Sequence, residues 1–548
     1  MTAGYAPEPA LDDLLPDLLR RRAGADGARE FVRDVDGRSM TYAAAYARAC
    51  SVANGLIATG VTRGESVVIM ADNAPDSICT WLGISLAGAV EVAINTGYRG
   101  HSLEHVMQNS QARVAFVEAQ LLPRLVEIRE SLSHLTTVVV YGAPGTAATL
   151  EVPGCTVVDF EDLLGDETDP QVPVGPHDIA SVVYTSGTTG PAKGVMMPHG
   201  QIRLFSRLGV EGARMGADDA FYCFIPLFHV AGKFIGIMGS MMTGGRVVLD
   251  TRFAVEAFLP RARQHGCTIA LLHGPLVEML YQLPESPDDA DNPITRIMAS
   301  PFPAHLAVDF ERRFGIRGIE TWGMTEVTIP IWQPFDEPLR LGSCGRLRDE
   351  HFELRIVDPD TDEEMPLGRT GEMVLRPKRP FTMMQGYLRM PEVTLETWRN
   401  LWFHTGDLGY LGEDGYVYFV DRVKERIRRR AENISSFEIE IAGVAHPGVA
   451  ECAAVGVPSE FDGDDDVLLC VVPVPGSRPD ESELIRHLAA ELPHFMVPRY
   501  LRYLEALPRT PTGKPQKVQL RGEGVTDDTW DRKAAGISLR SVLQEVEQ

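Results

Sequence analysis

One segment of the sequence combines the residue types that bind phosphate groups. Residues 184–194 read Y-T-S-G-T-T-G-P-A-K-G and contain three glycines, four serine or threonine hydroxyls and one lysine. Glycines let backbone N–H groups approach phosphate oxygens, hydroxyls donate further hydrogen bonds, and lysine adds a positive charge. The spacing differs from G-x-x-x-x-G-K-[ST] and from G-x-G-x-x-G, so we predict a phosphate-binding loop of another type, against the simpler interpretation of a polar turn. The candidate ligands are Thr185, Ser186, Gly187, Thr188, Thr189, Gly190 and Lys193.

Four shorter motifs follow this segment along the chain. They are W-G-M-T-E at 322–326, F-H-T-G-D at 403–407, D-R-V-K at 421–424 and R-T-P-T-G-K at 509–514. Together with the first segment, they resemble the signature motifs of the adenylate-forming superfamily, which includes acyl-CoA synthetases, peptide-synthetase adenylation domains and luciferases. The sequence is therefore identified as a member of that superfamily, of the acyl-CoA synthetase or AMP-dependent ligase type.

The resemblance implies a role for single residues of each motif. Glu326 is expected to coordinate a Mg²⁺ ion that bridges ATP phosphates, and Thr325 to hydrogen-bond a phosphate. Asp407 is expected to accept both ribose hydroxyls, and Arg422 to contact the same ribose from the other domain. Lys514 is expected to bridge the attacking carboxylate and the α-phosphate, where it would neutralise developing charge. The expected nucleotide-binding set also includes Trp322, Gly323 and Met324.

The implied reaction has two steps. A substrate oxyanion attacks the α-phosphate of ATP and gives an adenylate and pyrophosphate, and a second nucleophile then displaces AMP. In the superfamily the small C-terminal domain rotates between the steps about a hinge, which falls at Lys424 here. ATP and Mg²⁺ are thus the expected cofactors, with CoA as the acceptor. A catalytically inactive relative and a P-loop ATPase are weaker alternatives, because the charged motif residues are all present and the Walker lysine spacing is absent.

Ala431 leaves the identity of the acceptor open. It stands where related acyl-CoA synthetases carry the glycine of G-E-N-I, in a loop that lines their pantetheine tunnel, and a Cβ there can restrict close backbone approach. The alternatives to CoA are an amine, a carrier-protein thiol, or activation of nitrite instead of a carboxylate to form a diazo group.

Two substrate-side segments also depart from the superfamily pattern. In P-L-F-H-V-A-G-K at 226–233, His229 matches a histidine that lies near the substrate carboxylate, whereas Lys233 is unusual in an apolar stretch. A buried lysine needs a partner, so we expect Lys233 to meet an anionic group of the substrate or a protein carboxylate.

The second of these segments is I-M-A-S-P-F-P at 297–303. Ser300, Pro301 and Phe302 replace a glycine-rich segment that runs along the adenine in the superfamily. With Trp322, the bulk of Phe302 favours a short pocket and hence a small or aromatic acid, and Lys233 adds a dianionic acid as a further candidate.

Alternating strand and helix patterns must position these residues. The pattern predicts a helix over 42–59, a strand over 65–70, a helix over 77–88 and strands over 90–95 and 179–184. This alternation favours parallel α/β sheets in a large domain at 1–420, with a small β subdomain after residue 342. The basic run at 421–430, with six lysines and arginines, marks the hinge, and residues 421–548 are predicted to form a smaller mobile α+β domain.

Composition and charge exclude several classes of protein. The chain has 548 residues and a formal net charge of −24, which disfavours a nucleic-acid partner. No apolar run approaches the roughly 18 residues of a membrane span, and the N-terminus lacks a signal-peptide pattern, so we expect a cytoplasmic protein. The eight cysteines are scattered without zinc-site spacing. Nothing in the sequence indicates an oligomeric state.

Overall fold

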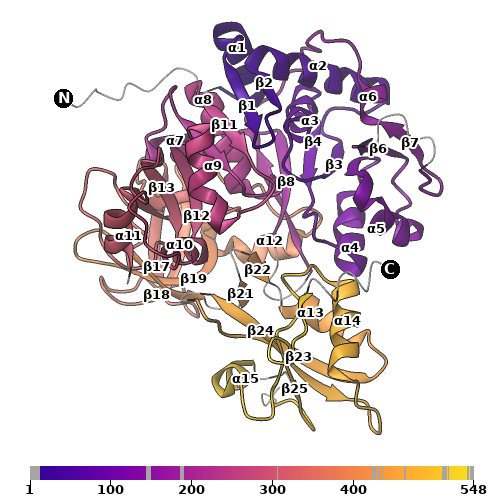
Figure 1. Cartoon of the computed structure of the whole chain (residues 1–548), viewed down its shortest axis with the longest axis vertical. Helices are drawn as coiled ribbons and strands as arrows, with labels where there is room; N and C mark the ends of the chain where they lie inside the picture. Colours follow the sequence, from indigo (N-terminus) through magenta and orange to yellow (C-terminus); the bar gives the residue numbers. More distant parts are fainter. Residues whose placement is uncertain are drawn as a thin grey trace.

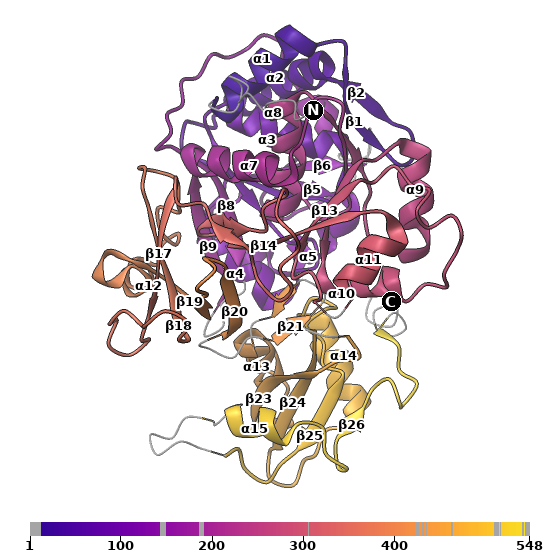
Figure 2. The ribbon, with the colours of Figure 1, turned by 90° about the vertical axis from the view of Figure 1, so that its left-hand side faces the viewer.

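The computed structural model combines two large sheets, a small antiparallel sheet and a C-terminal α+β part (Figure 1). It describes residues 13–142, 150–185, 191–304, 306–422, 427–429, 432–434, 436–461, 464–508, 515, 517–539 and 542. In Figures 1 and 2 the C-terminal part, coloured yellow, lies below the two large sheets. This is the α/β architecture that the alternating pattern predicts.

The first large sheet has seven strands in the order β7-β6-β5-β3-β4-β8-β9. All neighbours pair in parallel except β8 and β9, which form an antiparallel hairpin. Its strands are β3 (Ser66–Met70), β4 (Val90–Ala93), β5 (Val114–Glu118), β6 (Thr137–Tyr141), β7 (Thr156–Asp159), β8 (Ile179–Thr185) and β9 (Lys193–Pro198). Its helices are α3 (Pro75–Leu86), α4 (Gly100–Ser110), α5 (Leu122–Glu127) and α6 (Phe160–Leu163), with the 3₁₀ turns η2 (Ala119–Leu121) and η3 (Arg129–Ser131).

The second large sheet has nine strands in the order β16-β15-β14-β13-β12-β10-β11-β1-β2. The strands from β1 to β14 in this order are parallel, and β2, β15 and β16 add antiparallel edges. They are β1 (Glu30–Asp34), β2 (Ser39–Thr41), β10 (Ala220–Cys223), β11 (Arg246–Leu249), β12 (Ile269–His273), β13 (Arg296–Ser300), β14 (Arg317–Met324), β15 (Thr328–Trp332) and β16 (Arg346–Leu347).

Helices cover the second sheet and fill the space toward the first. The helix α7 (His199–Ala213) contacts β8 and β9 of one sheet and β13 and β15 of the other, and it packs on the π-helix η5 (Ala231–Met238). The remaining helices are α1 (Leu15–Asp26), α2 (Tyr42–Ala58), α8 (Gly239–Thr243), α9 (Phe258–His265), α10 (Gly274–Tyr281) and α11 (Ala307–Phe314), with the turn η6 (Val255–Ala257).

The predicted small β subdomain is a four-stranded antiparallel sheet. It contains β17 (Phe352–Val357), β18 (Gly371–Pro377), β19 (Phe403–Leu411) and β20 (Val417–Arg422), with α12 (Pro391–Thr397) and η7 (Arg399–Leu401) beside it. The F-H-T-G-D motif therefore begins β19, and the D-R-V-K motif begins at the end of β20.

The C-terminal part contains a hairpin, a mixed four-stranded sheet and three helices. Its strands are β21 (Ile427–Arg429), β22 (Glu432–Ile434), β23 (Val449–Pro458), β24 (Asp465–Pro473), β25 (Tyr500–Tyr503) and β26 (Trp530–Asp531). Its helices are α13 (Ser436–Val444), α14 (Glu481–Glu491) and α15 (Lys517–Glu523). Among the described residues, its buried apolar clusters start at Ile427, whereas the large N-terminal cluster ends at Val417. The domain boundary at 420/421 and the mobility of the smaller domain stay predictions.

Candidate nucleotide and substrate site

The phosphate-loop segment connects two paired strands. It starts at the end of β8 and returns in β9, with Thr185 opposite Lys193, and the Thr185 hydroxyl lies 3.5 Å from the Lys193 carbonyl oxygen. The strand predicted at 179–184 is thus confirmed. The five loop candidates Ser186, Gly187, Thr188, Thr189 and Gly190 lie outside the described residues.

A tyrosine that the sequence motifs do not include connects this hairpin to Glu326. Tyr387 forms an antiparallel bridge with Val195 of β9, which places its side chain beside the loop. The Lys193 Nζ atom lies 5.0 Å from the centre of the Tyr387 ring, and the Tyr387 hydroxyl donates a 3.0 Å hydrogen bond to Glu326 Oε1. A lysine, a phenol and a buried carboxylate therefore converge at the base of the predicted phosphate loop.

The turn that carries Thr325 and Glu326 is held by its backbone. It joins β14 to β15, and the Gln201 amide of α7 donates hydrogen bonds to the Thr325 and Glu326 carbonyl oxygens at 2.8 and 3.0 Å. The Met384 N–H donates to the same Glu326 carbonyl at 3.0 Å. Gly323 permits the tight packing of this hairpin, since a Cβ there would lie 2.2 Å from the Thr328 oxygen. Gln201 and Tyr387 carry no sequence signal that would have singled them out.

Trp322 and Asp407 meet although they come from different sheets. The Trp322 indole N–H donates a 3.0 Å hydrogen bond to Asp407 Oδ2, and both side chains are buried. The Asp407 N–H donates to the Thr405 hydroxyl at 3.0 Å, which fixes the turn before it. Asp407 pairs in register with Arg422 of β20, whose side chain is not described. Since Trp322 belongs to β14, which leads into the turn with Glu326, this hydrogen bond connects Asp407 to the strand before that turn.

Ser300 and Pro301 lie at the carboxyl end of β13, next to β14. Their peptide bond is cis, and the following N–H, of Phe302, donates a 3.2 Å hydrogen bond to Glu320 of β14. The Phe302 ring packs edge-on against Phe310 of α11 and lies over Gly318. Its bulk therefore fills the space between sheet and helix, so Phe302 does not shorten the acid pocket as expected.

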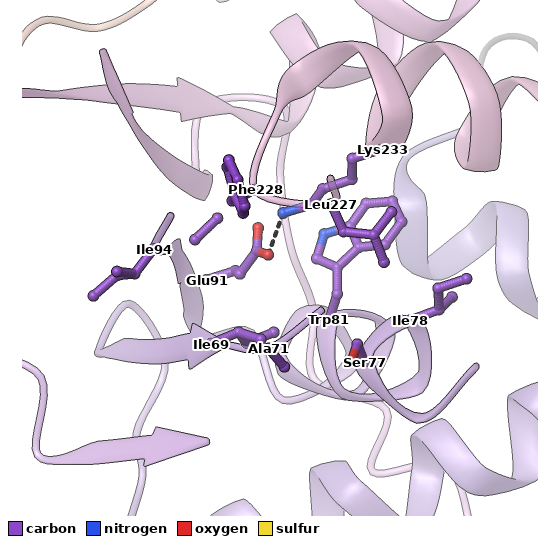
Figure 3. A pocket seen from close by; sticks show the side chains of 11 residues that line it. Ile69, Ala71, Ser77, Ile78, Trp81, Glu91, Ile94, Leu227, Phe228 and Lys233 are labelled. Carbon is purple, nitrogen blue, oxygen red and sulfur yellow. Dashed lines mark hydrogen bonds and ion pairs between the residues drawn. The ribbon is translucent and has the colours of Figure 1, made fainter. Parts of the chain in front are cut away.

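His229 and Lys233 lie at the start of the π-helix η5. The His229 carbonyl accepts a 3.3 Å hydrogen bond from the Lys233 N–H, and the Lys233 side chain pairs with Glu91 of β4 (Figure 3). Of the two partners expected for Lys233, the protein carboxylate is the one found. Burial lowers the pKa of Lys233, and the Glu91 carboxylate opposes that shift.

A groove lies where the C-terminal part meets the sheets. Its volume is about 540 Å³, and its lining includes Arg99, Arg124, Phe228, His494 and Phe495. Phe228 also lines the small cavity beside Lys233, so it separates the groove from that cavity. The groove thus has cationic and aromatic walls and ends next to His229.

A carboxyl group from the C-terminal part is buried against the N-terminal part close to this groove. Glu438 of α13 accepts a 3.5 Å hydrogen bond from the Ser102 hydroxyl of α4 and another from the Ala192 N–H, just before β9. Burial raises the pKa of Glu438 from 4.5 to about 7, against the effect of these two bonds. Lys424, Ala431 and Lys514 lie outside the described residues.

Comparison with known protein families identifies the family to which the chain with this site belongs. The family model of the AMP-binding enzymes matches residues 19–388, and the model of their C-terminal domain matches residues 438–514. The chain belongs to the AMP-binding enzyme family. It is an adenylate-forming, AMP-forming ligase of the acyl-CoA synthetase type that uses ATP, as its motifs predict.

Several AMP-binding enzymes resemble this one along nearly its whole length. A sulfoacetate–CoA ligase of Cupriavidus necator is 31% identical over 527 residues, which are 94% of this chain and 98% of the relative. The 4-coumarate–CoA ligase 3 of Oryza sativa subsp. japonica is 29% identical and covers 95% of this chain and 93% of its own. The solved structure of the amide bond synthetase McbA from Marinactinospora thermotolerans is 25% identical, with TM-score 0.79 and coverage of 92% and 99%. These AMP-binding enzymes differ in acid and in acceptor, so the family alone names neither.

In this AMP-binding enzyme, the described helices include none that is both long and apolar enough to span a membrane.

Proposed function

We propose that this AMP-binding enzyme adenylates a small aromatic or dianionic carboxylic acid and transfers the acyl group to CoA. The observation that carries the proposal is the convergence of Lys193, Tyr387 and Glu326 beside the Trp322–Asp407 pair. This arrangement offers a cation for phosphate oxygens and fixed carboxylates for a metal ion and a ribose.

Each group has a defined task in the adenylation step. Lys193 and the hydroxyls and N–H groups of residues 185–190 would bind the β- and γ-phosphates. Asp407, oriented by the Trp322 N–H, would accept hydrogen bonds from the ribose hydroxyls together with Arg422. Lys514 would lie between the acid and the α-phosphate, where it offsets the charge that develops as pyrophosphate leaves. His229 would border the acid carboxylate, and Ser300 to Phe302 and Trp322 to Met324 would enclose the adenine.

Glu326 fits the expected Mg²⁺ ion. A carboxylate can accept about four interactions, so the bond from Tyr387 orients the group and leaves capacity for a hard cation. When bound, Mg²⁺ would neutralise charge on the ATP phosphates.

The acid is proposed from the relatives. Sulfoacetate carries two negative charges and coumarate an aromatic ring, so both proposed classes occur among similar enzymes. Because Lys233 is paired with Glu91, a second anionic group of the acid would have to find another donor.

CoA is proposed as acceptor from the groove at the junction of the two parts. Arg99 and Arg124 suit phosphate groups, and the groove ends at Phe228, next to His229. The two CoA ligases above are further support for a thiol acceptor.

ATP–pyrophosphate exchange tests the first half-reaction. We expect a panel of small aromatic acids and dicarboxylic or sulfonated acids to contain at least one that supports exchange, and Lys514→Ala to abolish it. Absence of exchange with every acid would contradict the proposal.

A second acceptor class is favoured by one observation, the likeness to an amide bond synthetase. With an active acid in hand, mass spectrometry of reactions with CoA, with amines and with neither separates the two. A thioester as main product supports CoA, whereas an amide formed in preference to the thioester favours an amine acceptor.

A further inference from the structure

A buried ion pair connects η5 to β4 of the first large sheet. Lys233 of η5 and Glu91 of β4 are hydrogen-bonded to each other, and both side chains are 2% exposed (Figure 3). The Lys233 Nζ atom also lies 5.6 Å from the centre of the Trp81 ring of α3. The cavity beside the pair has a volume of about 10 Å³, close to the minimum for one water molecule, so the pair has no room for a substrate group.

One end of the pair is tied to the strand that begins the phosphate loop. Glu91 and Ser181 are neighbours in register on β4 and β8, and the Ser181 hydroxyl donates a 2.7 Å hydrogen bond to Glu91 Oε2. Ser181 lies four residues before Thr185, on the same strand. A displacement of Glu91 would therefore act on the strand from which the loop starts.

The other end is tied to the histidine expected at the acid carboxylate. The Lys233 N–H donates to the His229 carbonyl, one helical turn back, and η5 packs on α7, β10 and β12. The described contacts thus run continuously from β8 through Ser181, Glu91 and Lys233 to His229, and they connect the first large sheet to the helix that packs on the second.

Stability alone gives little reason for an ion pair at this place. Taking two charges out of water costs several kcal/mol each, and well-packed apolar residues of similar volume often replace a buried pair at no loss. Unlike an apolar contact, the hydrogen bond of the pair is directional, so the lysine and the carboxylate fix each other's position.

We propose that Glu91 and Lys233 are positioning residues that set the distance between His229 and β8, the strand that ends at Thr185, during adenylation. They contact neither ATP nor the acid, and they act through Ser181 on one side and the η5 backbone on the other. The inference rests on the adenylation of an acid near His229.

The test separates positioning from packing with two variants. Lys233→Met leaves the Glu91 carboxylate buried without its cation, so Tm should fall. The double variant Glu91→Leu/Lys233→Met removes both charges and should recover most of that loss. If the pair positions the site, the exchange kcat of the double variant stays at least about tenfold below that of the wild type, while KM for ATP changes by less than about threefold.

A matched control is the buried ion pair of Arg313 and Asp289, in which the Arg313 Nε atom lies 2.7 Å from Asp289 Oδ2. Arg313→Met/Asp289→Leu should alter Tm without changing kcat. Recovery of kcat together with Tm in the Glu91→Leu/Lys233→Met variant would overturn the proposal.

An independent readout does not require activity. The imidazole ¹H–¹³C signal of His229, assigned with a His229→Gln variant, should shift in both Lys233 variants and stay in place in the control. An unshifted signal overturns the positioning role, whereas a wild-type enzyme without exchange on any acid counts against the proposed function instead.

Discussion

Two buried glutamates close to the phosphate loop are held in different ways. Glu326 accepts from the Tyr387 hydroxyl, and its backbone is held by Gln201 and Met384, all within residues 13–422. Glu438 is 6% exposed, yet its described hydrogen bonds come from Ser102 and Ala192 across the junction with the C-terminal part.

Glu326 thus belongs to a fixed site, held within one part of the chain, whereas the contact of Glu438 depends on how the two parts are arranged. Groups held from within one part keep their geometry in any arrangement of the two parts, so the predicted movement of the C-terminal part would leave the Glu326 and Asp407 carboxylates in place. The Glu438 contact exists only while α13 lies against α4, and its raised pKa means that a proton favours it. Variants of Glu326 and Asp407 should change the kinetics of adenylation. Variants of Glu438 should change the arrangement of the C-terminal part relative to the sheets.

The largest effect is expected for Glu326→Gln. The amide keeps the size of the side chain and can still accept from Tyr387, but it loses the charge that suits Mg²⁺. We expect the exchange kcat to fall by about a hundredfold or more, with Tm unchanged. Steady-state ATP–pyrophosphate exchange at a series of Mg²⁺ concentrations measures this loss of kcat. Glu353→Gln, at a half-exposed strand position paired with Arg376, is the control and should leave exchange intact.

Asp407→Asn should have the next largest effect. A charged hydrogen bond to a ligand is worth about 1.5–3 kcal/mol, so KM for ATP should rise about tenfold to a hundredfold with a smaller change in kcat. Trp322→Phe keeps the ring but removes the N–H that orients Asp407, and it should raise KM by less than about tenfold. An unchanged KM for ATP in Asp407→Asn would remove this carboxylate from the ribose site.

The sequence predicts the strands that carry the fixed site better than it predicts the side-chain contacts within that site. Alternation and turn residues place β4 and β8 correctly, because both strands are buried in a parallel sheet and read as apolar runs. In the structure the motif residues Thr325 and Glu326 lie in the turn between β14 and β15, and Asp407 lies within β19.

Local patterns of apolar and turn residues do not predict contacts between residues that are far apart in the chain. Tyr387 reaches Glu326 only because residues 385–388 pair with β9, and Phe302 packs on α11 because Gly318 leaves space for its ring. For Lys233, burial predicted that a partner was needed, yet nothing local identified Glu91, 142 residues away.

The junction should respond to pH. We call the arrangement in which α13 lies against α4 the docked arrangement. There the pKa of Glu438 is about 7, and it would return toward 4.5 in solvent. Between these two pH values, docking therefore takes up a proton on Glu438. Docking is therefore strongest below about pH 4.5, weakens as pH rises through 7 and levels off above, a total change of roughly 3 kcal/mol. Small-angle X-ray scattering between pH 5 and 8 should follow this loss.

The variant that isolates this effect is Glu438→Gln, whose arrangement should stay constant over the same pH range. Glu440→Gln is its control, because Glu440 pairs with Lys517 inside the C-terminal part. A wild type and a Glu438→Gln variant with the same pH response would show that another group governs docking.

The smallest effect, and the one that best fixes the geometry of the junction, is expected for Ser102→Ala. The Ser102–Glu438 hydrogen bond is 3.5 Å long, at the limit of such bonds, so it is worth about 0.5 kcal/mol. Because this bond favours the charged carboxylate, its loss should raise the pKa of Glu438 in the present arrangement by a further amount of about 0.4, which the pH dependence of its carboxyl ¹³C signal measures. A pKa that falls in Ser102→Ala would mean that Ser102 stabilises the protonated carboxyl instead, and it would leave the Ala192 N–H as the described contact that favours the charged form.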